Sequence, residues 1–167
     1  MKQFIAILMI TLLLCGCSAE ETVETIADEL IVPVMAQPKE ISVSLPGEAA
    51  MPAVEGSSGR IYVCEDYEIV IQTYPSGDLN ATIQEVSGYA RDILTVMETN
   101  QNGADRYDFV WASAGEGGDQ LGRAVIWDDG DYHYTMAVTR PADTTETSQI
   151  TWNQVFSSFA LGSTEAG

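Results

Sequence analysis

Side chains suited to acid–base or nucleophilic chemistry are scarce in this 167-residue sequence. The chain has one histidine, His133, which lies between two tyrosines in an alternating stretch. A serine hydrolase triad would need this imidazole, but no G-x-S-x-G motif supplies a nucleophile. Zinc would need three or four cysteine, histidine or carboxylate ligands at suitable spacing. We therefore expect His133 to be a partly exposed strand residue, and we expect no catalytic residue and no metal site.

Three aspartates, Asp128, Asp129 and Asp131, flank Gly130. Clustered carboxylate oxygens are the ligands that Ca²⁺ prefers, which makes these residues lesser candidates for a cation site. Their spacing departs from that of an EF-hand loop, which alternates its acidic residues and ends in glutamate. The favoured interpretation is turn chemistry, because Asp-Gly is a residue pair typical of tight hairpins.

A glycine-rich segment, AGEGGD at 114–119, does not predict a phosphate-binding loop. No Lys-Ser or Lys-Thr pair follows it, and its two acidic residues would repel phosphate. Paired carboxylates serve glycosidases, but nothing in the sequence selects one pair among 25 Asp and Glu. We expect a hairpin loop here, and a protein that is not an enzyme and binds no cofactor.

Negative charge dominates the sequence, with seven Lys and Arg against 25 Asp and Glu and a net charge of −18. Nucleic-acid binding requires clustered cations that contact phosphates, so this balance argues against nucleic acid as a partner. A strongly acidic domain is also repelled by anionic polymers, which favours a protein partner with a basic patch. A small molecule or a cation is the alternative class of ligand.

The N-terminus has the pattern of a processing signal. Lys2 supplies a short positive region, and the stretch FIAILMITLLL at 4–14 is apolar except for Thr11. A transmembrane helix needs about 20 apolar residues, so this stretch is too short to span a bilayer. Its length is typical of the apolar part of a signal peptide.

Leu14-Cys15-Gly16-Cys17 resembles the lipobox of bacterial lipoproteins, which has a large aliphatic residue three positions before the modified cysteine and a small residue directly before it. The resemblance implies a signal peptide at 1–16 and a diacylglyceryl group on Cys17. Two or three acyl chains give a stable anchor, whereas one binds a membrane marginally. We expect the mature chain at the extracytoplasmic face of the cell membrane. A plain secretory signal is the alternative.

Residues 17–40 are expected to form a lipidated acidic tether that contains Pro33 and Pro38. Apolar residues at 23–30 recur at helical spacing, so a short amphipathic helix is the alternative. After processing and lipidation, Cys64 would be the one remaining thiol, which excludes an internal disulfide. Its apolar neighbours predict a buried, unreactive cysteine.

Residues 41–161 are expected to form one domain, followed by a tail at 162–167. Asn102-Gly103 and Asp129-Gly130 are strong hairpin signals between alternating apolar runs. Asp78 and Gly88 are expected to begin and end a helix. Strands are predicted at 41–45, 60–64, 67–74, 94–99, 106–112, 122–127 and 132–138.

The last predicted helix carries Trp152, Val155, Phe156 and Phe159 at the i, i+3, i+4, i+7 spacing of one helical face. An antiparallel sheet can leave one face wet but needs cover on the other, which this aromatic stripe would supply. The sequence therefore predicts an α+β fold, a largely antiparallel meander covered by two or three helices.

The order of these elements, with the ending Trp152-x-x-Val155-Phe156-x-Ser158-Phe159, resembles the PsbP-like fold, which includes the extrinsic PsbP subunit of photosystem II and a Ran-binding nuclear import factor. The stretch 41–159 is also similar to uncharacterised small lipoproteins of gut Firmicutes. The resemblance implies a PsbP-like sandwich that serves binding or assembly without catalysis. The partners of the known members do not transfer, because their contact residues do not map onto this chain.

Overall fold

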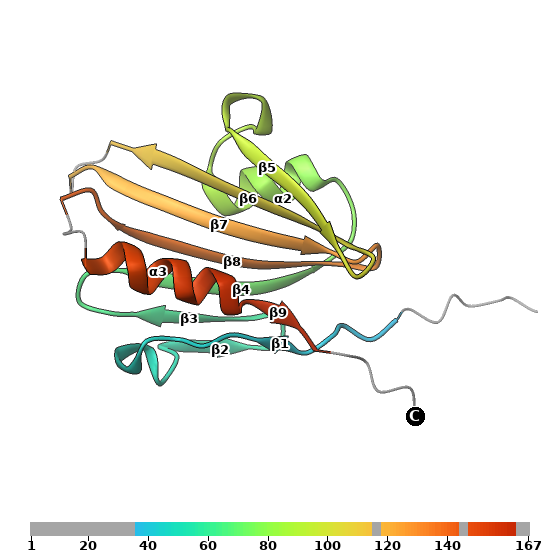
Figure 1. Ribbon diagram of the computed structural model, residues 1–167, viewed down its shortest axis with the longest axis horizontal. Coiled ribbons are helices and arrows are strands. Elements are labelled where there is room, and N and C mark those ends of the chain that lie inside the picture. The colour runs from blue at the N-terminus through green and yellow to red at the C-terminus, as the bar shows by residue number, and fades with distance from the viewer. Residues whose placement is uncertain (1–35, 115–117, 144–146, 163–167) are drawn as a thin grey trace, which may run out of the picture. The chain divides into compact units, whose positions relative to one another are not determined.

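The computed structural model describes residues 36–114, 118–143 and 147–162. In this part the chain has nine strands, two α-helices and two short 3-10 helices (Figure 1). The elements in chain order are β1 (Ile41–Ser42), η1 (Gly47–Ala49), β2 (Val54–Gly56), β3 (Gly59–Val63), β4 (Glu68–Pro75), α2 (Leu79–Ser87), η2 (Arg91–Ile93), β5 (Val96–Gln101), β6 (Ala104–Ser113), β7 (Gln120–Asp128), β8 (Tyr132–Pro141), α3 (Thr147–Ser158) and β9 (Ala160–Leu161).

Seven strands form one antiparallel sheet in the order β2-β3-β4-β8-β7-β6-β5. The first three strands form a meander from one edge to the centre. The chain then passes through α2 to the far edge and returns as the meander β5 to β8, whose last strand pairs with β4. This pairing joins the two meanders over eight residues, from Glu68 opposite Thr139 to Pro75 opposite Tyr132. The expected α+β fold with a largely antiparallel meander is confirmed.

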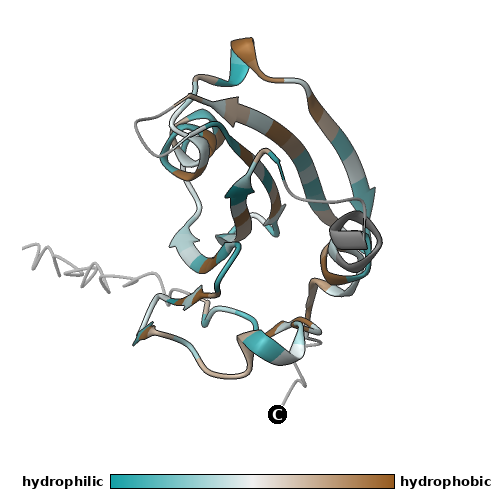
Figure 2. Cartoon of the chain, turned by 90° about the vertical axis from the view of Figure 1, so that its left-hand side faces the viewer, coloured by the Kyte–Doolittle hydropathy of each residue, from teal (hydrophilic) through white to brown (hydrophobic). Residues whose placement is uncertain are grey.

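One face of the sheet packs against α3. Every second side chain of each strand points to this face, because successive residues of a strand alternate between the two sides of the sheet. Figure 2 shows the resulting bands of hydrophobic and hydrophilic residues along the strands. The main core cluster on this side includes Tyr134, Met136 and Val125 from the sheet, with Phe156 and Phe159 from the C-terminal segment. The predicted aromatic stripe is therefore buried, as expected.

The opposite face packs against α2, so both faces of the sheet are covered. Tyr107 and Phe109 from β6 and Ile126 from β7 form a second core cluster with Ile83 of α2. An antiparallel sheet can leave one face wet, but in this sheet both faces are covered. The reason is that alternate residues on both sides of β6, β7 and β8 are apolar, and burial of each apolar face stabilises the fold.

Short-range sequence signals predicted α2 and two hairpin turns at the positions where the structure has them. The Asp78 carboxylate accepts a hydrogen bond of 2.9 Å from the Asn80 amide, and Gly88 ends the helix at φ 79°. Asn102 and Gly103 both have positive φ in the β5–β6 turn, as a type I′ turn requires. At the β7–β8 turn the Asp129 carboxylate accepts from the Tyr132 amide, and Gly130 supplies the positive φ of 92°.

Other elements had no local signal. β2 lies inside a stretch rich in glycine, serine and proline, a composition that predicted a loop. β9 pairs with β1, although the two strands are more than 100 residues apart in the sequence. Residues 36–40, expected in the tether, contact the β7–β8 hairpin. The Tyr132 hydroxyl donates to the Ala36 carbonyl at 2.8 Å, and the Lys39 amide donates to the Tyr134 hydroxyl at 2.8 Å.

Replacement of Phe156 by alanine should lower the free energy of unfolding by about 3–5 kcal/mol. The ring is 1% exposed and packs in the main core cluster, so the substitution removes buried area and leaves a cavity. Urea unfolding followed by circular dichroism measures the change. Gln154→Ala, at an exposed position of the same helix, is the matched control and should change stability by less than about 0.5 kcal/mol. A loss below about 1 kcal/mol for Phe156→Ala would contradict the assignment of this ring to the core.

Candidate functional site

A cleft of about 570 Å³ lies between α3 and the neighbouring ends of β6, β7 and β8. This volume is in the range of small-molecule sites, about 300–1,000 Å³. Its floor is the α3 face of the three strands, and its wall is the first described side chains of α3. The lining residues include Val110 and Ala112 from β6, Leu121 and Arg123 from β7, Val138 and Arg140 from β8, and Trp152, Asn153 and Phe156 from α3.

The register of the β7–β8 hairpin brings two arginines to this floor. Arg123 lies opposite Val138, and Leu121 lies opposite Arg140. Arg123 and Arg140 are therefore diagonal neighbours on one face of adjacent strands, where long side chains reach one another. The two arginines are 17 positions apart in the sequence, and only the pairing of the strands brings them together. The signal was available in the Asp129-Gly130 turn, which fixes the pairing of these two strands.

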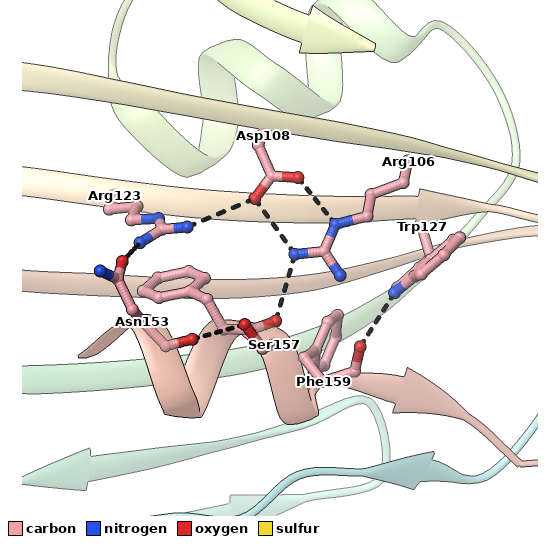
Figure 3. Close-up of polar contacts among 8 residues, drawn as sticks. Arg106, Asp108, Arg123, Trp127, Asn153, Ser157 and Phe159 are labelled. Carbon is pink, nitrogen blue, oxygen red and sulfur yellow. Dashed lines mark hydrogen bonds and ion pairs between the residues drawn. The ribbon is translucent and has the colours of Figure 1, made fainter. Parts of the chain in front are cut away.

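The Arg123 guanidinium is held in place by three neighbours (Figure 3). It donates to the Asn153 side chain at 2.8 Å, lies 3.8 Å from the Asp108 carboxylate, and stands over the Phe156 ring at 4.2 Å from the centroid. Burial lowers the pKa of Arg123, while the Asp108 carboxylate opposes that shift. Arginine stays protonated in proteins, so this group places a fixed positive charge at the cleft.

Asp108 is shared with a third arginine. Arg106 donates to both of its carboxylate oxygens, at 2.7 and 3.1 Å, and also to the Phe156 carbonyl at 3.1 Å. Two-pronged contacts of this kind are strong and geometrically specific. The network ties β6 and β7 to the C-terminal turn of α3, and it fixes the wall of the cleft relative to the floor.

On the opposite, α2 face of the sheet, an aromatic side chain packs against the strands that form the floor of the cleft. Trp111 points to the α2 face, where its ring lies across Gly122 of the neighbouring strand and 5.9 Å from the Phe109 ring. A Cβ atom at position 122 would overlap the indole ring. Glycine at this position therefore lets a large aromatic side chain cover the sheet behind the cleft.

Towards the β5 edge of the sheet, α3 no longer covers this face. Met97 on β5 and Val110 on β6 belong to the same face of the sheet and are 61% and 59% exposed. Exposed apolar side chains next to a cleft are typical of binding surfaces.

His133 is buried, and the expectation of a partly exposed histidine is wrong. It is 1% exposed, because it points to the face that α2 covers. Its Nδ1 atom lies 2.8 Å from the Thr82 hydroxyl of α2, and its Nε2 atom lies 3.4 Å from the Asp128 carboxylate. The order hydroxyl, imidazole, carboxylate matches that of a hydrolase triad. Thr82 is 8% exposed and sits within the helix, so the hydroxyl lacks the access that a nucleophile needs, and the contacts instead satisfy a buried imidazole.

Two of the three aspartates suggested as cation ligands, Asp128 and Asp129, have partners for their carboxylates within the chain. Both Asp129 oxygens accept hydrogen bonds, from the Tyr132 and Asp131 amides on one side and the Tyr134 hydroxyl on the other. Lys39 completes the set at 2.8 Å from the carboxylate. Asp128 accepts from the Gly130 amide at 2.9 Å. In residues 36–114, 118–143 and 147–162 no group of three or more His, Cys, Asp or Glu side chains is arranged to hold a metal ion.

The cysteines lie away from the cleft. Cys64 is half-buried and packs against the main core cluster. Cys17, the expected lipid attachment site, lies outside the described residues, as does the rest of the leader. Among the residues that the structure does describe, no helix has the length and apolar character needed to cross a bilayer.

No family model and no curated protein matches the sequence. Among solved structures, a protein from Bacteroides thetaiotaomicron VPI-5482 is similar, with 13% identity, a TM-score of 0.50, and coverage of 77% of this chain and 50% of that one. This chain thus spans half the length of that protein. A protein of unknown function from Pseudomonas aeruginosa, PA94, is 15% identical, with a TM-score of 0.47 and coverage of 80% and 90%. At 13% identity, the first comparison concerns the fold alone.

The ion pair between Lys39 and Asp129 makes stability depend on pH in the acid range. Burial alone would raise the pKa of Asp129, but hydrogen bonds from Lys39 and from the Tyr132 and Asp131 amides outweigh it, so the pKa is below its usual 3.8. A carboxyl group with a lowered pKa in the folded state stabilises the fold above the unfolded pKa. This stabilisation is present above about pH 4 and is lost as the pH falls through the folded pKa.

Asp129→Asn should therefore lower the free energy of unfolding by about 1–2 kcal/mol at pH 7, because a charged acceptor of several hydrogen bonds is removed. The loss should shrink as the pH falls below about 4, because the wild-type carboxylate becomes protonated as the pH passes through its lowered pKa. Urea unfolding at several pH values measures both effects. Asp131→Asn, an exposed neighbour, is the control and should behave like the wild type. A loss that stays constant while the wild-type carboxylate is titrated in the acid range would contradict the role of the ion pair.

Proposed function

We propose that this protein is a lipid-anchored extracytoplasmic binding protein whose folded domain takes a small ligand in the cleft beside α3, without catalysis. The observation that carries the proposal is the cleft itself, a cavity of about 570 Å³ with apolar walls and two arginines at its floor. A largely apolar pocket with a few converging polar groups is the usual form of a ligand site.

Binding without catalysis is supported by where the reactive groups lie. His133, Asp128 and Thr82 belong to the α2 face of the sheet, whereas the cleft opens on the α3 face. A general base must come within hydrogen-bonding reach of the atom that it deprotonates. In the described part of the lining, the polar side chains are two arginines and an asparagine, which bind and orient ligands but do not act as bases at neutral pH.

The anchor is supported by the leader sequence. The apolar stretch at 4–14 and the lipobox-like residues that end at Cys17 fit a lipoprotein signal. A lipid on Cys17 would hold the domain at the outer face of the cytoplasmic membrane, and the acidic residues before the domain would be repelled by an anionic bilayer.

A protein partner is the second candidate, in keeping with the binding or assembly role expected from the sequence. It is favoured by Met97 and Val110, which extend an exposed apolar surface from the cleft to the edge strand β5. Exposed apolar surface that continues from a cleft to an unpaired strand edge suits a protein interface. A partner docked there would lose affinity on Met97→Asp, whereas a small ligand confined to the cleft would not.

Ala112→Trp should abolish ligand binding and leave the domain folded. Ala112 is exposed and lines the cleft, so a bulky side chain there fills the site without entering the core. Screening of a chemically mixed panel of small acids, amides and amines by thermal unfolding should reveal compounds that raise the melting temperature of the wild type but not of this variant. Val63→Trp, an exposed strand position on β3, is the control and should keep the shifts. Compounds that stabilise both forms equally, or a panel without any binder, would overturn the proposed cleft.

Cys17→Ser should release the protein from membranes, because the substitution removes the sulfur that carries the acyl chains. Fractionation of cells that express each form measures the change, with Cys64→Ser as the control that keeps the anchor. Retention of Cys17→Ser in the membrane fraction after a carbonate wash would contradict lipid anchoring at this residue.

A further inference from the structure

We infer that the edge strand β5 is a docking site for an extended segment of a partner protein, a strand in which apolar residues alternate with lysine or arginine and which pairs with β5 as a further strand of the sheet. The inference rests on the second candidate of the proposed function, a protein partner, and names how that partner docks and what its chemistry is. Its basis is the open backbone edge of β5, the exposed apolar surface on one of its faces and the negative charge on the other.

β5 is the last strand on its side of the seven-stranded sheet in the described part of the chain (Figure 1). Proteins usually protect such an edge with a very short strand, a lysine, a proline or a bulge, because an open row of backbone groups pairs with other chains. β5 has six residues, VMETNQ, without lysine or proline, and its pairing with β6 is continuous from Val96 to Gln101. The edge strand on the other side, β2, has three residues. β5 is therefore the edge better suited to accept another strand.

The β5–β6 turn determines which backbone groups of β5 are open to a partner. Gln101 and Ala104 flank the two-residue turn at 102–103 and lie opposite each other. In such a hairpin the flanking pair exchanges backbone hydrogen bonds, and the direction of the backbone groups alternates along each strand. The N–H and C=O groups of Glu98 and Asn100 therefore point away from β6, to the side where an added strand would lie. Strand addition takes its affinity from groups of this kind.

The α3 face of β5 offers apolar contact. Met97 lies on this face beside Val110 of β6, and the two side chains are 61% and 59% exposed. Opposite positions on adjacent strands have their side chains about 4.5–5.5 Å apart, so an added strand would place every second side chain next to this surface. Contact with an apolar side chain would remove Met97 from water. This surface therefore predicts apolar residues at alternate positions of the partner strand.

The α2 face of the same hairpin carries an excess of negative charge. Glu98 lies opposite Tyr107 of β6, and its side chain is 57% exposed. Burial raises the pKa of Tyr107 and three nearby carboxylates raise it further, whereas Arg91 lowers it. The three carboxylates are those of Glu98, Asp105 and Asp128. A negative field on this face predicts lysine or arginine at the partner positions between the apolar ones.

The existing partner of Glu98 leaves room for a second cation. Arg91 lies 3.5 Å from Glu98 and 5.6 Å from the centre of the Tyr107 ring. Both members of the ion pair are partly exposed, and an exposed pair contributes little to stability. A basic side chain of the partner can therefore approach Glu98 without breaking a buried pair. The excess of acidic residues over the whole sequence, 25 against 7, would also attract a basic segment.

A second copy of this chain fits the edge less well than a basic strand. Two β5 strands side by side would bring their acidic side chains, such as Glu98, close together, and like charges on neighbouring strands are destabilising. Each copy also has a net charge of −18, which opposes association of the two. A strand with alternating apolar and basic residues avoids both penalties.

The inference is tested by fluorescence anisotropy of a labelled peptide titrated with the full mature chain. The probe is a capped eight-residue peptide of alternating lysine and valine. It should bind at least about tenfold more tightly than two controls of equal charge, one with four lysines followed by four valines and one with the central amides of the probe N-methylated. A peptide of alternating glutamate and valine should not bind. Affinity for the probe should fall as salt is raised, because salt screens charge attraction.

Glu98→Pro should weaken binding of the probe at least about tenfold, because proline removes an outward N–H group from the edge. Glu98→Gln keeps that group and should weaken binding by only about threefold through loss of charge. Glu55→Gln is the matched control and should bind as the wild type does, since Glu55 is an exposed glutamate on the other edge strand and is likewise paired with an arginine. Hydrogen exchange of the wild type gives a test that does not depend on the folding of a variant. The Glu98 and Asn100 amides should become protected when the probe binds.

Four results would overturn the inference. The first is no binding of the probe, and the second is equal binding of the probe and its two controls of equal charge, since charge alone would then account for the attraction. The third is binding that Ala112→Trp prevents and Glu98→Pro does not, which would place the peptide in the cleft. The fourth is a wild type that sediments as a dimer and becomes a monomer on Glu98→Pro, which would make the edge an interface between copies.

The inference and the proposed small-ligand function fail separately. Compounds that act in the cleft should still raise the melting temperature of Glu98→Pro, and Ala112→Trp should abolish that effect whether or not the peptide binds. A panel without any binder would overturn the small-ligand function and leave the peptide results at β5 unchanged.

Discussion

The alternation of side chains along β6, β7 and β8 is the constraint on which the rest of this structure depends. These strands are apolar on both sides, so each face of the sheet must be covered. Met136 of β8 lies in the cluster under α3, whereas its neighbour Ala137 lies in the cluster under α2. A shift of one residue in any of these pairings would exchange the two faces and place arginines under α2. The hairpin turns that fix the register therefore also fix which side chains meet at the cleft.

The same alternation explains why charged residues occur on a largely buried sheet. Arg106 and Asp108 are two residues apart on β6, and both point to the α3 face, where their side chains are only 14% and 13% exposed. Charges removed from water need close partners, and a two-pronged pair satisfies both groups. Arg123 extends this network to Asn153 on α3. These polar contacts, together with the buried rings of Phe156 and Phe159, hold the C-terminal segment against the sheet.

The sequence predicted what local chemistry controls and missed what distant contacts control. Asp78, Gly88 and the Asn102-Gly103 turn act within a few residues, and they placed α2 and a hairpin correctly. β9 forms only because β1 is beside it, and no short-range pattern reveals that pairing. His133 was expected to be partly exposed because neither its type nor its neighbours in sequence show that α2 folds over it. The cleft was missed for the same reason, since it exists only where α3 and three strands meet.

The separation of the two faces is the strongest structural argument for a binding role. The one imidazole of the chain is enclosed beneath α2, where Thr82 and Asp128 satisfy its nitrogens, and the sheet lies between this group and the cleft. A catalytic site needs its ligand and its acid–base group on the same side of such a barrier. Among the residues that the structure describes, those that line the cleft are two arginines, an asparagine, a glycine, and apolar and aromatic side chains. Under the proposed function, these groups would hold a ligand by charge, shape and burial.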